Sequence, residues 1–322
     1  KGEKVRLRFI NAAAMTIFDV KIPGVKMTVV ASDGQNVEPV TVDDFRIGVA
    51  ETYDVVVEPD PDTAHAIFAQ TIDRSGFASG ILTTDPYLKV ELPDLDPTPI
   101  LAMADMGMSH EGHQMSMKMD PSMDHAMHMD MEETKMGSGK AGFGSSTPVT
   151  HQQSEFGPHV DMRAETPEYK LDDPGIGWRD HKRFYRRKIL TYADLHNLYP
   201  TADLREPERE IELHLTGNMA RYMWSINGVK YADAEPIELK FGERVRFTLV
   251  NDTMMNHPMH LHGMWSELEN GDAANIPRKH TVLVQPGSKI SYLVTVDARG
   301  RWAYHCHLMY HMMSMFREVR VV

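Results

Sequence analysis

The sequence has a single cysteine, Cys306, in 322 residues. One thiol excludes a disulfide bond within the chain, so cysteine usage says nothing about the redox compartment. The chain also lacks any run of 18 or more apolar residues, and we therefore expect no transmembrane helix. The formal net charge of −12 argues against nucleic acid as a partner, because nucleic-acid binders neutralise phosphates with Lys and Arg.

Methionine, by contrast, is abundant, and the 24 methionines are unevenly placed. Residues 101–137 contain eleven of them together with four histidines. This composition is typical of a flexible low-complexity segment. Thioethers are also soft ligands suited to Cu(I), and imidazole binds copper too, so the same segment is predicted to collect copper. The candidate Cu(I) ligands are Met103, Met106, Met108, His110, His113, Met115, Met117, Met119, Met123, His125, Met127, His128, Met129 and Met131.

Most of the remaining chain predicts β-structure. Residues 4–10, 25–30 and 53–57 are short apolar or alternating runs separated by turn residues. From residue 210 onward apolar and polar residues alternate again, and His214 is expected to face outward from its strand. Asn227-Gly228 then predicts a hairpin turn. Short strands with turn signals between them favour an all-β sandwich or barrel.

The chain contains an internal repeat. Residues 1–11 resemble residues 241–251, at an offset of 240. In this register Ile17, Val20 and Ile22 of the first copy stand where the second copy has histidines at 257, 260 and 262. The β unit evidently does not need imidazole at these places, which favours a metal role for the three histidines. About seventy residues precede 241 in the second unit, so we expect the first copy to be truncated and the chain to be a fragment.

Two histidine clusters carry the chemistry. The first is the stretch 257–263, with histidines at 257, 260 and 262, and the second is His305-Cys306-His307 with His311 four residues further on. Two histidines and a cysteine can form a trigonal site with a weak axial ligand, which is the arrangement of a blue copper centre. Neighbouring side chains on a strand point to opposite faces. If Cys306 faces one metal, its neighbours therefore face another, and the sequence predicts two sites.

These motifs resemble the C-terminal copper signature of the multicopper oxidases. The resemblance extends through residues 208–210, 215–224 and 251–257 and the Met-rich segment to the bacterial copper-resistance branch, the CopA-type periplasmic oxidases. It implies an all-β chain of cupredoxin-like Greek-key domains, the second and third of three. The implied divisions are a partial second domain without copper ligands at 1–98, a Met/His-rich insert and linker at 99–168, and a C-terminal domain with copper ligands at 169–322.

The resemblance also implies the role of each ligand. His257, Cys306 and His311 would bind type 1 copper, His260 type 2 copper, and His262, His305 and His307 the type 3 pair. Cys306, His305 and His307 would then be the catalytic residues, and the complete enzyme would hold four copper ions.

Two features depart from the family pattern. The family takes two further His-x-His pairs for its trinuclear cluster from its first domain, and no such pair occurs before residue 100. A missing N-terminal cupredoxin segment is therefore an expected partner, and the chain alone is not expected to reduce oxygen efficiently. The family's axial residue lies ten positions after the cysteine, which is Phe316 here, with Met315 one position short. We favour Met315 as the axial ligand, and an apolar axial place at Phe316 is the alternative.

The predicted function is a periplasmic oxidase of copper resistance. It would oxidise Cu(I), and also phenolic substrates, at type 1 copper and pass electrons to a trinuclear cluster that reduces O2 to water. A copper-sequestering protein that stores Cu(I) in the Met-rich segment without turnover is the alternative. An electron-transfer cupredoxin is a third interpretation, but it leaves four of the histidines unexplained. Glu267 and Glu269 lie near the histidines and are expected to be surface carboxylates rather than proton donors.

Overall fold

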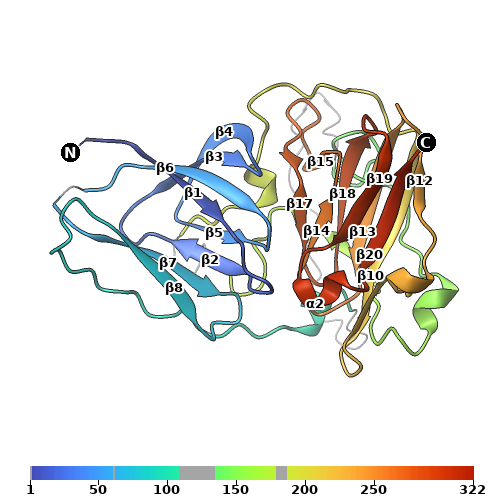
Figure 1. Cartoon of the computed structure of the whole chain (residues 1–322), viewed down its shortest axis with the longest axis horizontal. Helices are drawn as coiled ribbons and strands as arrows, with labels where there is room; N and C mark the ends of the chain where they lie inside the picture. Colours follow the sequence, from blue (N-terminus) through green and yellow to red (C-terminus); the bar gives the residue numbers. More distant parts are fainter. Residues whose placement is uncertain (1, 61, 109–134, 179–186) are drawn as a thin grey trace, which may run out of the picture.

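The computed structural model describes residues 2–60, 62–108, 135–178 and 187–322. Within them the regular secondary structure is nearly all strand and forms two β units that lie side by side (Figure 1). Each unit consists of two sheets. The all-β, cupredoxin-like prediction is therefore confirmed. No helix in this part of the chain is both long and apolar enough to cross a membrane.

The N-terminal unit has two four-stranded sheets, in the orders β1-β6-β3-β4 and β5-β2-β7-β8. Its strands are β1 (Val5–Ile10), β2 (Phe18–Lys21), β3 (Met27–Ser32), β4 (Gln35–Val42), β5 (Asp44–Ile47), β6 (Thr52–Val57), β7 (His65–Thr71) and β8 (Phe77–Leu82). The strands predicted from the sequence at 4–10 and 53–57 correspond to β1 and β6. The predicted strand at 25–30 begins two residues later and runs to Ser32. Alternate residues of β3 and β6, such as Met27, Val29 and Val55, fill the core between the sheets.

The C-terminal unit has a seven-stranded and a five-stranded sheet. The first has the order β11-β10-β13-β18-β15-β16 with β9 also paired to β18, and the second has the order β12-β20-β19-β14-β17. The strands are β9 (Glu168–Tyr169), β10 (Arg209–Asn218), β11 (Met223–Ile226), β12 (Ile237–Leu239), β13 (Arg244–Asn251), β14 (His257–Leu261), β15 (Ser266–Leu268), β16 (Arg278–Lys279), β17 (Thr281–Val284), β18 (Ser288–Thr295), β19 (Gly300–Cys306) and β20 (Phe316–Val321). The short helices are η1 (Met103–Met106), η2 (Gln153–Phe156), η3 (Tyr192–Asp194), η4 (Tyr231–Asp233) and α2 (Met309–Met312).

The internal repeat of the sequence is also a structural repeat. β1 corresponds to β13 and β2 to β14 at the same offset of 240. Each copy ends its first strand with an asparagine whose side-chain amide donates to two backbone carbonyls. Asn11 donates to Thr16 and Ile47, and Asn251 donates to Met255 and Val284. The bend into the following strand is therefore built in the same way with or without histidines.

Residues 135–178 contact the C-terminal unit over much of their length, and the carbonyls of Pro174 and Ile176 near their end accept hydrogen bonds from Arg46 of the N-terminal unit. Arg246 of β13 donates to the carbonyls of Gly139 and Lys140. Further along, the amide of Ala164 donates to Asp252. This covering segment corrects one expectation: His214 of β10 is 1% exposed and does not face solvent. The strand alternates as predicted, but its polar face is covered by protein.

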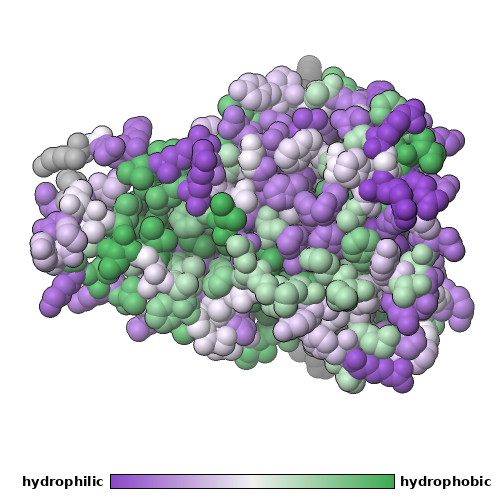
Figure 2. All heavy atoms as spheres, viewed as in Figure 1, coloured by the Kyte–Doolittle hydropathy of each residue, from purple (hydrophilic) through white to green (hydrophobic). Residues whose placement is uncertain are grey.

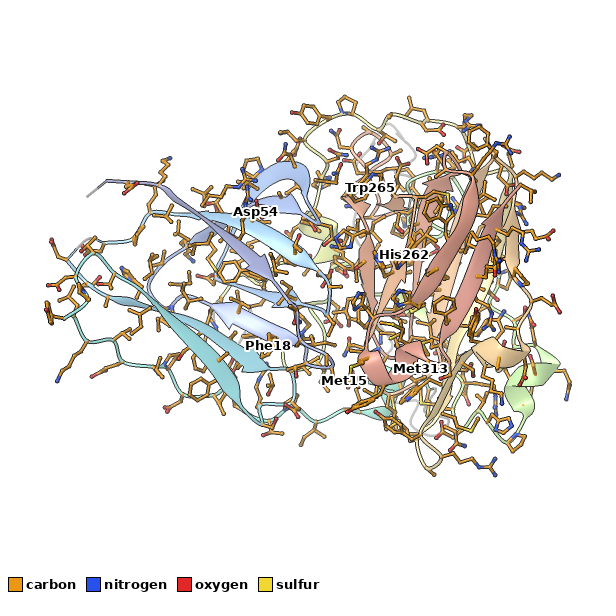
Figure 3. The ribbon with its side chains drawn as sticks, in the orientation of Figure 1. Met15, Phe18, Asp54, His262, Trp265 and Met313 are labelled. Atoms are coloured by element: carbon orange, nitrogen blue, oxygen red, sulfur yellow. The ribbon has the colours of Figure 1, made fainter. Side chains whose placement is uncertain are left out.

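The two units are joined by a buried charge cluster. Lys279 of β16 lies with its Nζ 3.0 Å from Asp33 Oδ2 and 3.1 Å from Glu51 Oε1, and all three side chains are almost fully buried. A second link is at α2, where the amide of Met309 donates to the carbonyl of Ala14 at 2.9 Å. Figure 3 shows Met15 and Met313 near each other at this junction.

Candidate metal centre

The two histidine motifs meet on adjacent strands. β14 carries the first motif and pairs antiparallel with β19, which carries the second. In this register Met259 lies opposite Cys306 and His260 opposite His305. Two stretches almost fifty residues apart in the sequence are therefore placed side by side. Because strand neighbours alternate between faces, the pairing sorts the histidines into two groups.

The first group is His257, Cys306 and His311, all completely buried. The distances are 3.5 Å from Cys306 Sγ to His257 Nδ1, 3.8 Å from Cys306 Sγ to His311 Nδ1, and 3.3 Å between the two Nδ1 atoms. Three ligands arranged trigonally at about 2.0–2.3 Å from one metal ion would be roughly 3.5–3.8 Å apart. The residues therefore fit a single metal ion with two imidazole ligands and one thiolate.

Residues outside the motifs orient these ligands. His257 Nε2 lies 2.7 Å from Thr253 Oγ1, and this outer hydrogen bond directs Nδ1 toward Cys306. The indole of Trp224 stacks on His311 with ring centroids 3.8 Å apart. Sequence reasoning missed Thr253 and Trp224, because a threonine in a turn and a tryptophan in a strand are ordinary in a sandwich. Their proximity to the histidines becomes visible only in the fold.

Burial governs the protonation of this group. It raises the pKa of Cys306 to about 12 and lowers the pKa of His311 to about 4. For His257, burial and then the proximity of His311 hold the pKa well below its usual range. Neutral imidazoles are the form in which histidine binds metals, so both histidines are in their ligand form at neutral pH. The thiolate, in contrast, needs a cation beside it.

The neighbours of Met315 and Phe316 bear on the choice of axial ligand. Phe316 pairs with His305 across β19 and β20, and its ring stacks on the His305 ring at 5.6 Å. Phe316 is therefore on the His305 side of the sheet. The amide of Cys306 donates to the carbonyl of Met315, and both side chains are completely buried in the same core cluster. This arrangement supports Met315, rather than Phe316, as the residue beside the first group.

The second group is His260, His262, His305 and His307. Ring centroids lie 4.5 Å apart for His260 and His262, 5.3 Å for His262 and His305, and 5.4 Å for His305 and His307. His262 Nε2 is 3.1 Å from His305 Nε2. This distance fits two ligands of one ion.

Outer hydrogen bonds also orient this second group. His260 donates through Nδ1 to the carbonyl of His280 at 2.6 Å, and His305 lies with its Nδ1 3.0 Å from the carbonyl of Cys306. In both rings Nε2 is left free to bind a metal. Burial, followed by smaller effects that include His262, lowers the pKa of His260 to about 4. His280, whose ring is 5.3 Å from that of His260, stands outside both sequence motifs, and its proximity was missed.

The remaining candidate residues are those of the Met-rich segment and two glutamates. Met103 and Met106 form the ends of η1, and Met108 follows it. The candidate ligands His110, His113, Met115, Met117, Met119, Met123, His125, Met127, His128, Met129 and Met131 lie outside the described residues. The expectation that Glu267 and Glu269 are surface carboxylates is wrong. They are 3% and 0% exposed, and they pair with Arg244 and Arg246 across the seven-stranded sheet.

Comparison with protein families gives two matches, both described as multicopper oxidase. One covers residues 1–86 and the other residues 205–322. The chain is 55% identical to a copper resistance protein A homolog of Pseudomonas syringae pv. tomato, over 99% of this chain and 55% of the relative. It is 54% identical to copper resistance protein A of Escherichia coli, over 99% of this chain and 56% of the relative. The chain thus spans about half the length of these relatives.

Solved structures agree on the fold. Fet3p, described as a multicopper oxidase that functions in iron import, matches with a TM-score of 0.61 at 16% identity, over 99% of this chain and 55% of that one. A laccase from Botrytis aclada matches with a TM-score of 0.60 at 17% identity, over 99% of this chain and 52% of that one. At these identities the likeness establishes the cupredoxin-like architecture alone.

Proposed function

The chain belongs to the multicopper oxidase family, and we propose that it is the copper-binding portion of an enzyme that oxidises Cu(I) in copper resistance with O2 as the electron acceptor. Copper is the cofactor of this family, and phenolic compounds are further candidate substrates. The observation that carries the proposal is the position of Cys306. Its side chain belongs to the first histidine group, while its two sequence neighbours belong to the second.

The two histidine groups support this function because they can hold copper ions and because the first group is closed to water. His257, Cys306 and His311, with Met315 as the axial residue, would hold type 1 copper. His260 would hold type 2 copper, and His262, His305 and His307 would hold the type 3 pair. Copper bound there would supply one-electron redox chemistry. Complete burial of the first group excludes water from the thiolate, and the covalent bonds from Cys306 to both neighbours connect the two groups without an intervening residue.

A pocket beside the first group supports Cu(I) as the substrate. It has a volume of about 440 Å³ and its lining includes Met15, Met254, Met255 and Leu308. The same lining includes Leu101, two residues before η1, so the chain enters the Met-rich segment beside this pocket. Thioethers favour Cu(I) over harder cations. Cu(I) that enters this pocket would meet thioethers close in sequence to His257, since Asn256 and Met255 also line it.

The proposal requires further histidines for the trinuclear cluster. We place them in the part of the relatives that this chain does not span. Figure 2 shows hydrophobic residues gathered on the N-terminal unit, and Ile10, Phe77 and Ile81 are each about half exposed or more. Apolar surface of this kind is typical of an interaction site, and it supports contact with a further cupredoxin domain there. A periplasmic location is part of the same proposal.

The test uses the full-length protein loaded with copper. We expect about four tightly bound ions, intense blue absorption from the thiolate–copper bond, and oxygen uptake with Cu(I). Cys306→Ser should lose the blue colour and the uptake. His307→Gln should keep the colour and lose the uptake, while His159→Gln, at an exposed position outside both groups, should keep both. A loaded protein with neither colour nor oxygen uptake would overturn the proposal.

Copper sequestration remains the second candidate, because the Met-rich segment favours it. Deleting residues 109–134 separates the two functions while leaving η1 and Met136, which packs against the core, in place. For an oxidase, the deletion should spare oxidation of phenols and reduce only the copper bound beyond the tight sites. For a sequestering protein, no turnover would be seen before or after the deletion.

A further inference from the structure

Four potential metal ligands converge at a place away from the copper groups. They are His151 and Glu155 of the covering segment, His214 of β10 and Asp252 directly after β13. One ligand atom from each lies within 4.8 Å of all the others. Glu155, His214 and Asp252 are buried, and the His151 side chain is 19% exposed. None of the four belongs to the histidine motifs of the sequence.

The distances suit one small cation. His151 Nδ1 is 2.8 Å from Glu155 Oε2 and 3.7 Å from Asp252 Oδ2. His214 Nδ1 is 2.7 Å from Asp252 Oδ2 and 3.4 Å from Glu155 Oε2. Ligands at the corners of a tetrahedron with bonds of about 2.0–2.1 Å are separated by roughly 3.3 Å. The four distances fall on both sides of this value, so a cation at the centre needs only small movements.

Outer hydrogen bonds turn both imidazoles inward. His151 donates through Nε2 to the carbonyl of Ala164 at 3.1 Å. His214 donates through its own Nε2 to Glu212 Oε1, also at 3.1 Å. Asp252 Oδ1 is held by the amide of Ala164 at 2.7 Å. Metal-binding histidines have this arrangement, with one ring nitrogen on the metal and the other on a carbonyl or carboxylate. In addition, Glu155 Oε1 is buried and has no hydrogen-bond partner among the described residues.

We propose that His151, Glu155, His214 and Asp252 form a binding site for one divalent cation of the Zn²⁺ and Cu²⁺ class. In the metal-free protein burial lowers the pKa of His214, but hydrogen bonds to Asp252 and Glu212 outweigh it and raise this pKa to about 10, so a cation would displace a proton there. With both imidazoles bound as neutral ligands, the two carboxylates leave a net charge of −2, which a divalent cation balances. Two nitrogen ligands disfavour Ca²⁺ and Mg²⁺, which prefer oxygen, and the absence of sulfur from these four side chains disfavours Cu(I).

The site would fasten the covering segment to the sheet. His151 and Glu155 come from the segment, whereas His214 and Asp252 come from neighbouring strands of the seven-stranded sheet. A bound cation therefore links three separate stretches of chain. Its role is structural and independent of Cys306.

The first experiment counts ions. Metal-free protein is exposed to Zn²⁺, freed of excess by gel filtration and assayed for zinc per chain. His151→Gln, at the most exposed of the four positions, should lower the count by one. His196→Gln is the matched control, because His196 pairs with Asp272 at 2.8 Å on the surface, and it should leave the count unchanged. Equal counts for the two variants would contradict the proposal.

The second experiment needs no variant. Crystals of the unaltered protein grown with Zn²⁺ are measured on both sides of the zinc absorption edge. The expected result is an anomalous peak within about 2.0–2.2 Å of His151 Nδ1, His214 Nδ1, Glu155 and Asp252. An anomalous map that has peaks at the other histidines and none here would overturn the inference, and His214 would then be a protonated partner of the two carboxylates.

Discussion

At the scale of single residues, the axial residue would set the redox potential of copper held by the first histidine group. The potential of a blue copper site depends on its axial ligand. Met315→Leu should raise the potential, because loss of the thioether leaves a three-coordinate copper. Met and Leu have similar volumes, so the substitution should cost less than about 1.5 kcal/mol of stability. Redox titration of the blue band measures the change.

Phe316→Leu is the control for the axial prediction. Phe316 stacks on His305 and should leave the potential of the blue site nearly unchanged. The reverse result, with a large shift for Phe316→Leu and none for Met315→Leu, would assign the axial place to residue 316.

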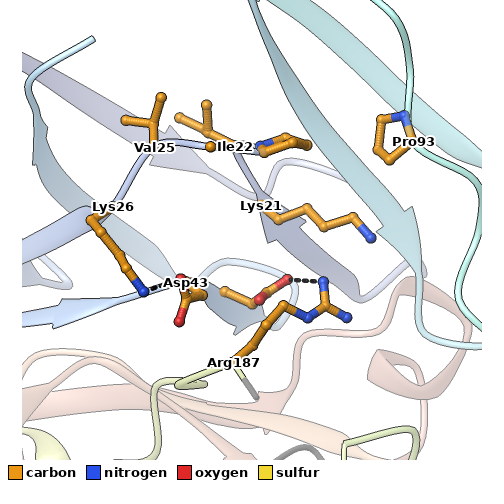
Figure 4. Close-up of a pocket in the computed structure, with 10 residues that line it drawn as sticks. Lys21, Ile22, Val25, Lys26, Asp43, Pro93 and Arg187 are labelled. Atoms are coloured by element: carbon orange, nitrogen blue, oxygen red, sulfur yellow. Dashed lines mark hydrogen bonds and ion pairs between the residues drawn. The ribbon is translucent and has the colours of Figure 1, made fainter. Parts of the chain in front are cut away.

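Asp44 predicts a pH dependence of stability. Figure 4 shows its surroundings, where Arg187 pairs with it and Lys26 with the adjacent Asp43. Burial raises the pKa of Asp44 to about 7. The folded state therefore keeps this proton between about pH 4 and pH 7, where the unfolded chain loses it. The unfolding free energy contributed by Asp44 should fall as pH rises through this window, by on the order of 4 kcal/mol.

The Asp44→Asn substitution removes this dependence of the unfolding free energy on pH. Relative to the unaltered protein, the variant should gain stability between pH 4 and pH 8, as measured by urea unfolding at several pH values. Asp43→Asn should instead lose stability relative to the unaltered protein over the same pH range. Burial raises the pKa of Asp43, but the hydrogen bonds from Lys26 and the Lys188 amide outweigh it and hold that pKa below its usual range. Parallel pH profiles for Asp44→Asn and the unaltered protein would refute the assignment.

Sequence reasoning placed the histidines into two groups because strand alternation is a local property. Cys306 and its neighbours must face opposite sides of β19, whatever surrounds them. Thr253, Trp224 and His280 could not be found in this way, because their roles come from contacts between strands. The burial of Glu267 and Glu269 was missed for the same reason: each is paired with an arginine two strands away in the sheet.

At the scale of elements, the covering segment contacts the tight turn that follows β11, where Ile226 and Val229 pair on either side of Asn227 and Gly228. Gly228 has a φ of +70°, and a Cβ there would lie 2.3 Å from the carbonyl oxygen of Ser154 in η2. Gly228→Ala should therefore displace η2 in addition to the cost of the left-handed backbone, about 1–2 kcal/mol. Hydrogen exchange of residues 151–164 should become faster.

Gly34→Ala is the matched control for this element. Gly34 has a φ of +75°, and a Cβ added there would have open space around it to a distance of 4 Å, so only the backbone cost applies. If both alanine variants lose the same stability and show the same exchange, the contact between η2 and the turn after β11 contributes nothing.

The covering segment also shows what a sequence pattern leaves open. Its Gly, Ser, Thr and Pro content correctly indicates irregular structure. The alternation of β10 correctly indicates one polar face. Neither pattern reveals that the irregular segment lies on that polar face, because a polar strand surface can be covered by water or by hydrogen-bonding chain. His214 is buried for this reason.

At the scale of the whole molecule, Lys279 links the two β units through its ion pairs with Asp33 and Glu51. Burial lowers the pKa of Lys279, but Asp33, Tyr53 and Glu51 more than compensate and hold it above its usual range. Lys279→Met would leave Asp33 and Glu51 buried without their cation. Removing one partner of a buried ion pair costs about 3–5 kcal/mol, and unfolding in guanidinium chloride should show a loss of this size.

A double variant tests the origin of that loss. Lys279→Met combined with Asp33→Asn removes one of the stranded charges and should recover part of the stability. A loss below about 1 kcal/mol for Lys279→Met alone, or no recovery in the double variant, would mean that the charge cluster does not hold the units together.

The repeat in the sequence predicted two related units, but it did not predict how they dock. The contacts at Lys279 and α2 join residues more than 200 positions apart, and such pairings leave no periodic signal in a single sequence. The resemblance of the copper motifs named the family, and the match of the folded units to cupredoxin-like structures supports the same architecture.

The bond from Met309 to Ala14 has a consequence for the order of assembly. The loop between Cys306 and His311 is only four residues long, and one of its amides is satisfied by the other β unit. The conformation of this ligand-bearing loop therefore depends on contact with the N-terminal unit as well as on its own strands. If the first group holds copper as proposed, its colour would report that the two β units have come together.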